Sequence, residues 1–125
     1  MMKKAAAAIA IGLAVAGAPL AYADGNWIAM AISDSTGLIK FVSGGTSESA
    51  ATQTVMSACR KTISDCRLLA TGQGGCVAIA ANGANSRYFG GWGPTRDEAE
   101  AAALAKAGGG RVLNDHTHCQ GDPSS

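Results

Sequence analysis

The chain has 125 residues, of which 47% are hydrophobic and 15% are charged, and its formal net charge is +1. This length suffices for one domain with a thin hydrophobic core. The charged side chains are scattered singly, without a basic stripe that could follow phosphate groups, so the composition argues against a nucleic-acid-binding protein.

The first 23 residues have the features of a cleavable signal peptide. Lys3 and Lys4 form a positive amino-terminal region, an apolar run follows, and Ala21-Tyr22-Ala23 matches the A-x-A cleavage pattern. The apolar run, residues 5–18, is shorter than the roughly 20 residues that span a bilayer. We therefore expect secretion or retention in the periplasm or cell envelope, without stable membrane insertion after cleavage. Cleavage removes two of the ten basic side chains, leaving eight against nine acidic ones and a net charge of about −1.

The remainder is expected to form a single domain over residues 24–121, followed by a short polar tail, residues 122–125. An internal repeat organises this domain. The segment WIAMAIS at Trp27 resembles CVAIAAN at Cys76, and the interval from Ala29 to Thr46 equals that from Ala78 to Thr95. We interpret the chain as two pseudo-repeats, about 27–70 and 76–119, that pack together and share one core.

The first pseudo-repeat begins with two predicted strands. The apolar run after Trp27 and the stretch Leu38–Val42 are joined by the turn-forming residues 33–37, which favours a hairpin. Apolar residues at helical spacing then predict a helix from about Ser47 to Arg60, capped by Thr46. A further strand is expected at Cys66–Ala70.

The second pseudo-repeat follows the same order, with strands at the run from Cys76 and at Arg87–Phe89. Thr95 is the expected helix cap, Glu98 completes a capping box, and the Ala-rich stretch ends at three glycines, residues 108–110. The last expected strand is Arg111–Leu113. The sequence thus predicts an α+β fold of two β-β-α-β units, with antiparallel sheet packed on one face by two Ala-rich helices.

These features together resemble a known bacterial family of secreted proteins, the domain of unknown function 4189 family. The resemblance rests on WIAMAIS, CVAIAAN, the G-G-T entry to the first helix, a cysteine at that helix end with another on the next strand, and GWGPTRDEAEAAALAKA. It covers nearly all of Trp27 to Cys119. It implies export, with some members proposed to act on a host, and it implies no particular chemistry.

The four cysteines predict a disulfide framework, because their number is even and all follow the signal peptide. Their spacings, C-x6-C, C-x9-C and C-x42-C, do not match the paired knuckles of a zinc site. The resemblance implies a bond between Cys59 and Cys66. Gly108 and Asp115 stand where the second half would repeat that pair, which leaves Cys76 to bond Cys119.

The pair of histidines in Asp115-His116-Thr117-His118-Cys119 is the sharpest chemical feature of the sequence. On a strand, His116 and His118 would project from one face, as a bidentate metal site requires. With Cys119 in a disulfide, only Asp115 remains nearby as a third ligand, and functional zinc or copper sites usually need three. We therefore expect no metal site and no cofactor, with His116 and His118 as the candidates should one exist.

No catalytic constellation is recognisable in the sequence. It contains no G-x-S-x-G, H-E-x-x-H, S-x-x-K or phosphate-binding loop motif, and Glu98 is better explained as a cap than as half of a carboxylate pair with Glu100. We predict no catalytic residues and a small secreted, non-enzymatic interaction or effector-like protein. The alternative is a metal-dependent or hydrolytic secreted enzyme centred on His116 and His118.

Trp92 is the candidate for an interaction residue. We expect it in a loop, Gly90-Gly91-Trp92-Gly93-Pro94, just before the second helix, and its counterpart in the first pseudo-repeat is Ser43, so the shared core does not require an indole here. An exposed tryptophan could anchor an unknown protein or a cell-envelope or host partner. The alternative is a lid that closes the hydrophobic core, since large aromatic side chains are buried on average.

Overall fold

The computed structural model describes residues 25–82 and 87–124, so the predicted signal peptide lies outside the described residues. The α+β class, with antiparallel strands and two packed helices, is confirmed. The elements are, in chain order, β1 (Trp27–Ser33), β2 (Ile39–Gly45), α1 (Glu48–Arg60), β3 (Cys66–Gln73), β4 (Cys76–Asn82), β5 (Arg87–Gly93), α2 (Arg96–Ala107), β6 (Arg111–Val112), the 3-10 turn η3 (Asn114–His116) and β7 (His118–Cys119).

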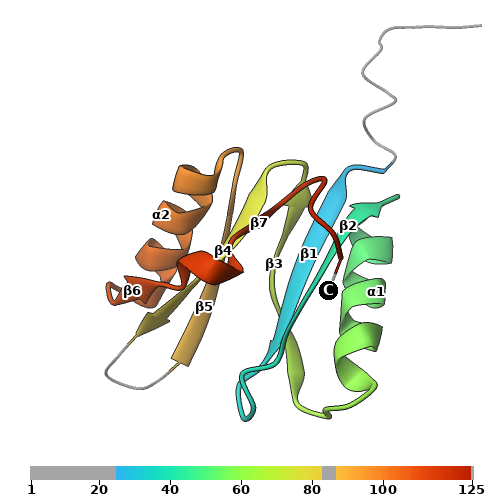
Figure 1. The fold of residues 1–125 in the computed structure, drawn as a ribbon, viewed down its shortest axis with the longest axis horizontal. Helices are drawn as coiled ribbons and strands as arrows, with labels where there is room; N and C mark the ends of the chain where they lie inside the picture. The colour runs from blue at the N-terminus through green and yellow to red at the C-terminus, as the bar shows by residue number, and fades with distance from the viewer. Residues whose placement is uncertain (1–24, 83–86, 125) are drawn as a thin grey trace, which may run out of the picture.

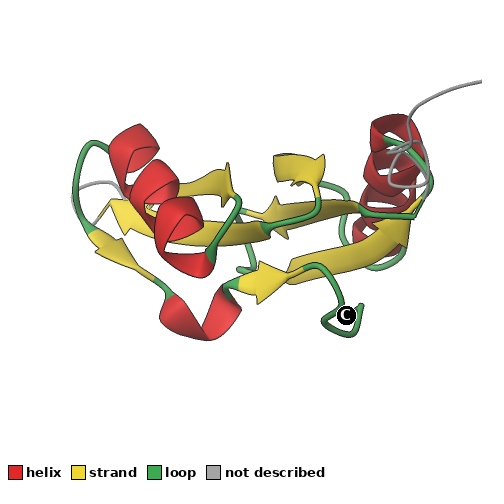
Figure 2. Cartoon of the chain, turned by 90° about the horizontal axis from the view of Figure 1, so that it is seen from above, coloured by secondary structure: helices red, strands yellow, loops and turns green. Residues whose placement is uncertain are grey.

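The strands form two sheets rather than one. The first has the order β2-β1-β3, and the second has the order β5-β4-β6 with β7 also paired to β4. The expectation that both helices cover one face is wrong, because each helix packs on the outer face of its own sheet. Figures 1 and 2 show α1 and α2 at opposite ends of the molecule with both sheets between them. The result is a four-layer arrangement of helix, sheet, sheet and helix.

The two hairpins have matching registers. Met30 lies opposite Phe41 and Ala31 opposite Lys40 in the first, while Ile79 lies opposite Gly90 and Ala80 opposite Phe89 in the second. Both pairs in the second hairpin are the ones that the sequence repeat predicts from the two pairs in the first hairpin. The order β-β-α-β also occurs twice in the structure. Duplication of an ancestral unit stays a prediction.

The main core lies between the two sheets, because alternate residues of the strands point inward from both. Larger apolar side chains fill it, namely Ile28, Met30, Ile32, Phe41, Leu69, Val77 and Ile79. The outward positions in the middle of the central strands β1 and β4 are alanines, so the helices approach closely there. Ala29 and Ala31 meet Val55 of α1, and Ala78 and Ala80 meet the alanines of α2.

Two glycines let β5 fit between α2 and the first sheet. A Cβ atom on Gly91 would collide with the backbone of Ala103 in α2, and one on Gly90 would lie 2.6 Å from the carbonyl oxygen of Leu69 in β3. Both glycines are therefore required by close approach rather than by backbone conformation. Their packing places β5 directly against β3, which joins the two sheets along this flank.

The helix ends follow local sequence chemistry with one exception. The hydroxyl of Thr95 accepts a hydrogen bond from the backbone N–H of Glu98, and Gly108 ends α2 in the left-handed conformation, both as the sequence predicts. The expected cap of α1 is wrong by one residue. Ser47, not Thr46, accepts the backbone N–H of Ala50 at 3.0 Å.

Two disulfides each join a pair of elements. The bond between Cys59 and Cys66 joins the end of α1 to the start of β3. The bond between Cys76 and Cys119 joins β4 to β7, a strand of only two residues. In the part of the chain that the structure describes, α1 and α2 have 13 and 12 residues, and neither is a candidate membrane span.

Candidate functional site

The C-terminal segment, residues 114–124, carries the two predicted histidines. It lies on the side of the molecule formed by β2 and β7, opposite the side where β3 meets β5. β7 pairs with β4, and the chain then reaches β2 of the other sheet. There the hydroxyl of Ser43 donates to the carbonyl oxygen of Asp122 at 2.9 Å, and the backbone N–H of Ser43 donates to the hydroxyl of Ser124 at 3.2 Å. The segment therefore connects the two sheets at this flank.

His118 makes the aromatic contact of this connection. Its ring stacks on Phe41 of β2, with centroids 4.9 Å apart and planes 21° apart. Its Nδ1 lies 3.8 Å from a carboxylate oxygen of Asp122. Burial lowers the pKa of His118, and the positive charges of His116 and Arg96 act in the same direction, while Asp122 opposes them. The structure thus favours the neutral ring.

The expectation that His116 and His118 share one face of a strand is wrong. His116 ends the 3-10 turn η3, and Thr117 separates it from His118 in β7. Among residues 25–82 and 87–124, no three side chains of histidine, cysteine, aspartate or glutamate are grouped so that they could hold a metal ion.

Thr117, between the histidines, connects the C-terminal segment to α2. It is buried, and its hydroxyl donates a hydrogen bond to the carboxylate of Glu100 at 2.8 Å. Glu98 binds the cap residue Thr95. The two glutamates therefore serve different contacts, and their present partners are structural.

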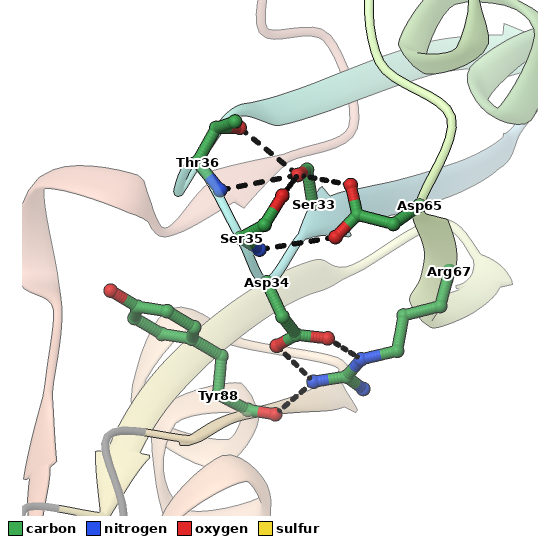
Figure 3. A network of polar contacts seen from close by, with 7 residues as sticks. All are labelled: Ser33, Asp34, Ser35, Thr36, Asp65, Arg67 and Tyr88. Atoms are coloured by element: carbon green, nitrogen blue, oxygen red, sulfur yellow. Dashed lines mark hydrogen bonds and ion pairs between the residues drawn. The ribbon is translucent and has the colours of Figure 1, made fainter.

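A second polar cluster, which the sequence reasoning missed, lies at the turn between β1 and β2 (Figure 3). The hydroxyl of the fully buried Ser33 donates to Asp65 at 2.7 Å and accepts from the backbone N–H and the hydroxyl of Thr36. The other carboxylate oxygen of Asp65 accepts the backbone N–H of Ser35 at 3.1 Å. Hydrogen bonds from Ser33 and Ser35 lower the pKa of Asp65.

These hydrogen bonds hold the hydroxyl of Ser33 in place rather than activate it as a nucleophile. A hydroxyl has one donor and two acceptor positions, and Ser33 uses all three within the turn and its partner loop. The cluster accordingly holds the turn against the loop between α1 and β3. The turn residues 33–37 were visible in the sequence, but Asp65 lies 32 positions after Ser33, so no local pattern connects them.

Arg67 extends this cluster to the second sheet. Its guanidinium donates to both carboxylate oxygens of Asp34, and its Nη2 also donates to the carbonyl oxygen of Tyr88 at 2.6 Å (Figure 3). The hydrogen bond from Arg67 lowers the pKa of Asp34. Because Asp34 and Arg67 belong to the first sheet and its turn while Tyr88 is in β5, the contact joins the two sheets.

The expected loop position of Trp92 is wrong, because the residue lies within β5, where it pairs with Val77 of β4. Its side chain lies against β3 and is partly exposed. Its side chain occupies the space above Gly72, where a Cβ atom would collide with the indole, and the indole N–H donates to the carbonyl oxygen of Gly74 at 2.8 Å. The residue is 38% exposed. It therefore covers the end of β3 and at the same time remains partly exposed to solvent.

These observations define a disulfide-stapled α+β protein whose two sheets face each other across the main core. The sequence matches the family described as a domain of unknown function (DUF4189) over residues 27–120. The chain belongs to this family, which confirms the resemblance. No curated protein and no solved structure matches it.

Proposed function

We propose that the chain is an exported, non-enzymatic interaction protein that presents Trp92 to a partner, either an unknown protein or a component of the cell envelope or of a host. The observation that carries the proposal is the fixed orientation of an exposed indole. Packing on Gly72 and the hydrogen bond to Gly74 hold the ring, so little conformational entropy remains to be lost on binding. Tryptophan is enriched among the residues that dominate binding energy.

The disulfides support export. All four cysteines are paired in the structure, and structural disulfides form and persist in oxidising compartments. The test is the mass of the protein recovered outside the cytoplasm. The proposal predicts a chain that begins at Asp24 and carries no free thiol. A chain that still contains residues 1–23, or that alkylates with iodoacetamide without prior reduction, would contradict it.

The interaction is tested by site-specific crosslinking with the mature, oxidised protein. A photoreactive phenylalanine analogue replaces Pro94, which is exposed and two positions from Trp92, and in a matched control it replaces the exposed Ala105 of α2. The expected result is an adduct from position 94 that is absent from position 105 and is lost when Trp92→Ala is added. An adduct that survives Trp92→Ala, in a variant shown to be folded by circular dichroism, would overturn the role of Trp92.

A further inference from the structure

The outward surface of α1 differs from that of an ordinary solvated helix. From Ser49 to Cys59 the helix carries no charged residue, although much of its outer side is exposed. The corresponding surface of α2 carries charges of both signs, at Arg96, Asp97, Glu98 and Lys106. Mixed charge is typical of a helix face that meets only water, so α1 is the exception in this protein.

An exposed apolar side chain lies beside this surface. Leu68 of β3 is 36% exposed, and the irregularity in the pairing of β1 with β3 places it opposite Ala31, on the outer side of the sheet where α1 packs. β3 is an edge strand of its sheet, so Leu68 lies where the sheet ends. Its position next to α1 creates an open hollow of about 500 Å³, lined by Thr52, Gln53, Met56, Ser57, Arg60 and Leu68.

The charged residues at one end of this hollow are both positive. Arg60 is part of its lining, and Lys61 lines an adjoining hollow with Gln53, Thr54, Ser57 and Ala58. Of the residues that the structure describes, no carboxylate lines either hollow. Within the part of the chain that the structure describes, neither Arg60 nor Lys61 forms an ion pair. Two cations therefore stand at the carboxyl end of α1, where the helix dipole favours them but none of the described carboxylates pairs with them, beside a surface that is otherwise uncharged and partly apolar.

We propose that this α1 surface, together with Leu68, binds an acidic segment of a partner protein. Met56 and Leu68 would take an apolar side chain of that segment, and Arg60 and Lys61 would take a carboxylate close to it. The apolar contact favours a peptide over an anionic glycan, whose hydroxyl-covered surface would leave Leu68 without an apolar partner. This inference rests on the proposed function as an interaction protein and names a second surface, separate from Trp92.

The test uses nitrogen-15-labelled mature protein and two synthetic probes, acetyl-Glu-Leu-Asp-Glu-Leu-Asp-amide and the same peptide with lysine in place of each acidic residue. The acidic peptide should shift the amide signals of residues 52–61 and 68, and the basic peptide should bind at least about tenfold more weakly. Leu68→Asn should weaken binding of the acidic peptide several-fold. Binding of heparin that is as tight as that of the acidic peptide and insensitive to Leu68→Asn would overturn the choice of a peptide.

Charge reversal provides the matched comparison. Arg60→Glu with Lys61→Glu should reverse the preference between the two peptides, whereas Arg96→Glu with Lys106→Glu, the same change in net charge made on α2, should leave it unaltered. If the reversed pair weakens the helix end, Arg60→Gln with Lys61→Gln should still abolish the preference. Shifts that map elsewhere, no shifts at about 5 mM peptide, or self-association of the protein that Leu68→Asn abolishes would each contradict the inference. If the peptide test fails while the Trp92-dependent crosslink is still formed, the inference about the α1 surface is wrong and the proposed function is unaffected.

Discussion

The imidazole of His118 lies against the ring of Phe41, with centroids 4.9 Å apart, so the last strand of the second sheet contacts an edge strand of the first. This contact stands next to the disulfide between Cys76 and Cys119 and next to the hydrogen bonds that Ser43 makes with the tail. The flank therefore combines a covalent bond, an aromatic contact and polar contacts. A titratable ring in such a position makes stability depend on pH.

The free energy of unfolding should fall as the pH drops through the titration of His118. Burial lowers the pKa of His118 in the folded state below the ordinary value of 6.5, so the unfolded chain takes up the proton first. The stabilising contribution is present above pH 6.5 and is lost as the pH falls through the folded-state pKa. Urea denaturation at intervals from pH 7.5 to about pH 4.5 measures this loss.

Two variants identify the group responsible for that pH dependence. His118→Phe keeps an aromatic ring against Phe41 without a titrating group and should flatten the curve. Asp122→Asn removes the charge that opposes the lowering of the pKa and should steepen it. A curve with the same slope in His118→Phe as in the natural protein would assign the effect to another group.

The two disulfides should contribute unequally to stability. Their sequence separations are 7 and 43 residues, for which the loop-entropy relation gives about 2.5 and about 4 kcal/mol. The pair Cys76→Ala and Cys119→Ala should therefore lower the midpoint of thermal unfolding more than Cys59→Ala and Cys66→Ala. Calorimetry of both variants at one protein concentration makes the comparison, and the reverse order would show that strain or residual structure outweighs loop length.

Gly90→Ala should destabilise the protein through steric overlap rather than backbone strain. The added Cβ would lie 2.6 Å from the carbonyl oxygen of Leu69, forcing β5 away from β3 at a cost of about 1–3 kcal/mol. Ala101→Gly, at an exposed position of α2, provides a control that costs about 1 kcal/mol by helix propensity alone. An unchanged or raised free energy of unfolding in Gly90→Ala would mean that β5 can move away from β3 without penalty.

The histidines are expected to have no joint role in metal binding. His116 and His118 occupy different elements, and the ring of His118 is packed on Phe41. Titration of the metal-free protein with zinc and copper in a calorimeter should therefore give the same heats for the natural protein and for His116→Ala with His118→Ala. A binding heat that disappears in the double variant, while the fold is retained, would instead support the enzymatic alternative.

The sequence predicted those parts of the structure that depend on neighbouring residues. The cap at Thr95 and the stop at Gly108 rest on contacts within a few positions, so their residue types suffice to locate α2. The cap of α1 was misplaced because Thr46 and Ser47 are adjacent and chemically equivalent as caps. The order of strands and helices followed from hydrophobic periodicity and turn residues.

The parts that could not be predicted depend on distant residues. A hydrophobic strand reveals that a face is buried but not which strand covers it, so the division into two facing sheets was missed. The bonds of Ser33 with Asp65 and of Arg67 with Tyr88 join positions 32 and 21 residues apart. The histidines were assigned to one strand because alternation is the default for a short extended segment, whereas the turn at Asn114–His116 interrupts it.

The account is tested most directly by the affinity of Trp92 variants for the partner identified by crosslinking at position 94. Surface plasmon resonance with Trp92→Ala should show affinity lowered by about 30-fold or more, the loss typical of a dominant interface residue. The midpoint of thermal unfolding, measured alongside, should fall, because the indole also covers Gly72 and bonds to Gly74, but the variant should stay folded at the temperature of the binding measurement. Unchanged affinity in a folded Trp92→Ala protein would contradict the account and leave Trp92 as a cover for β3.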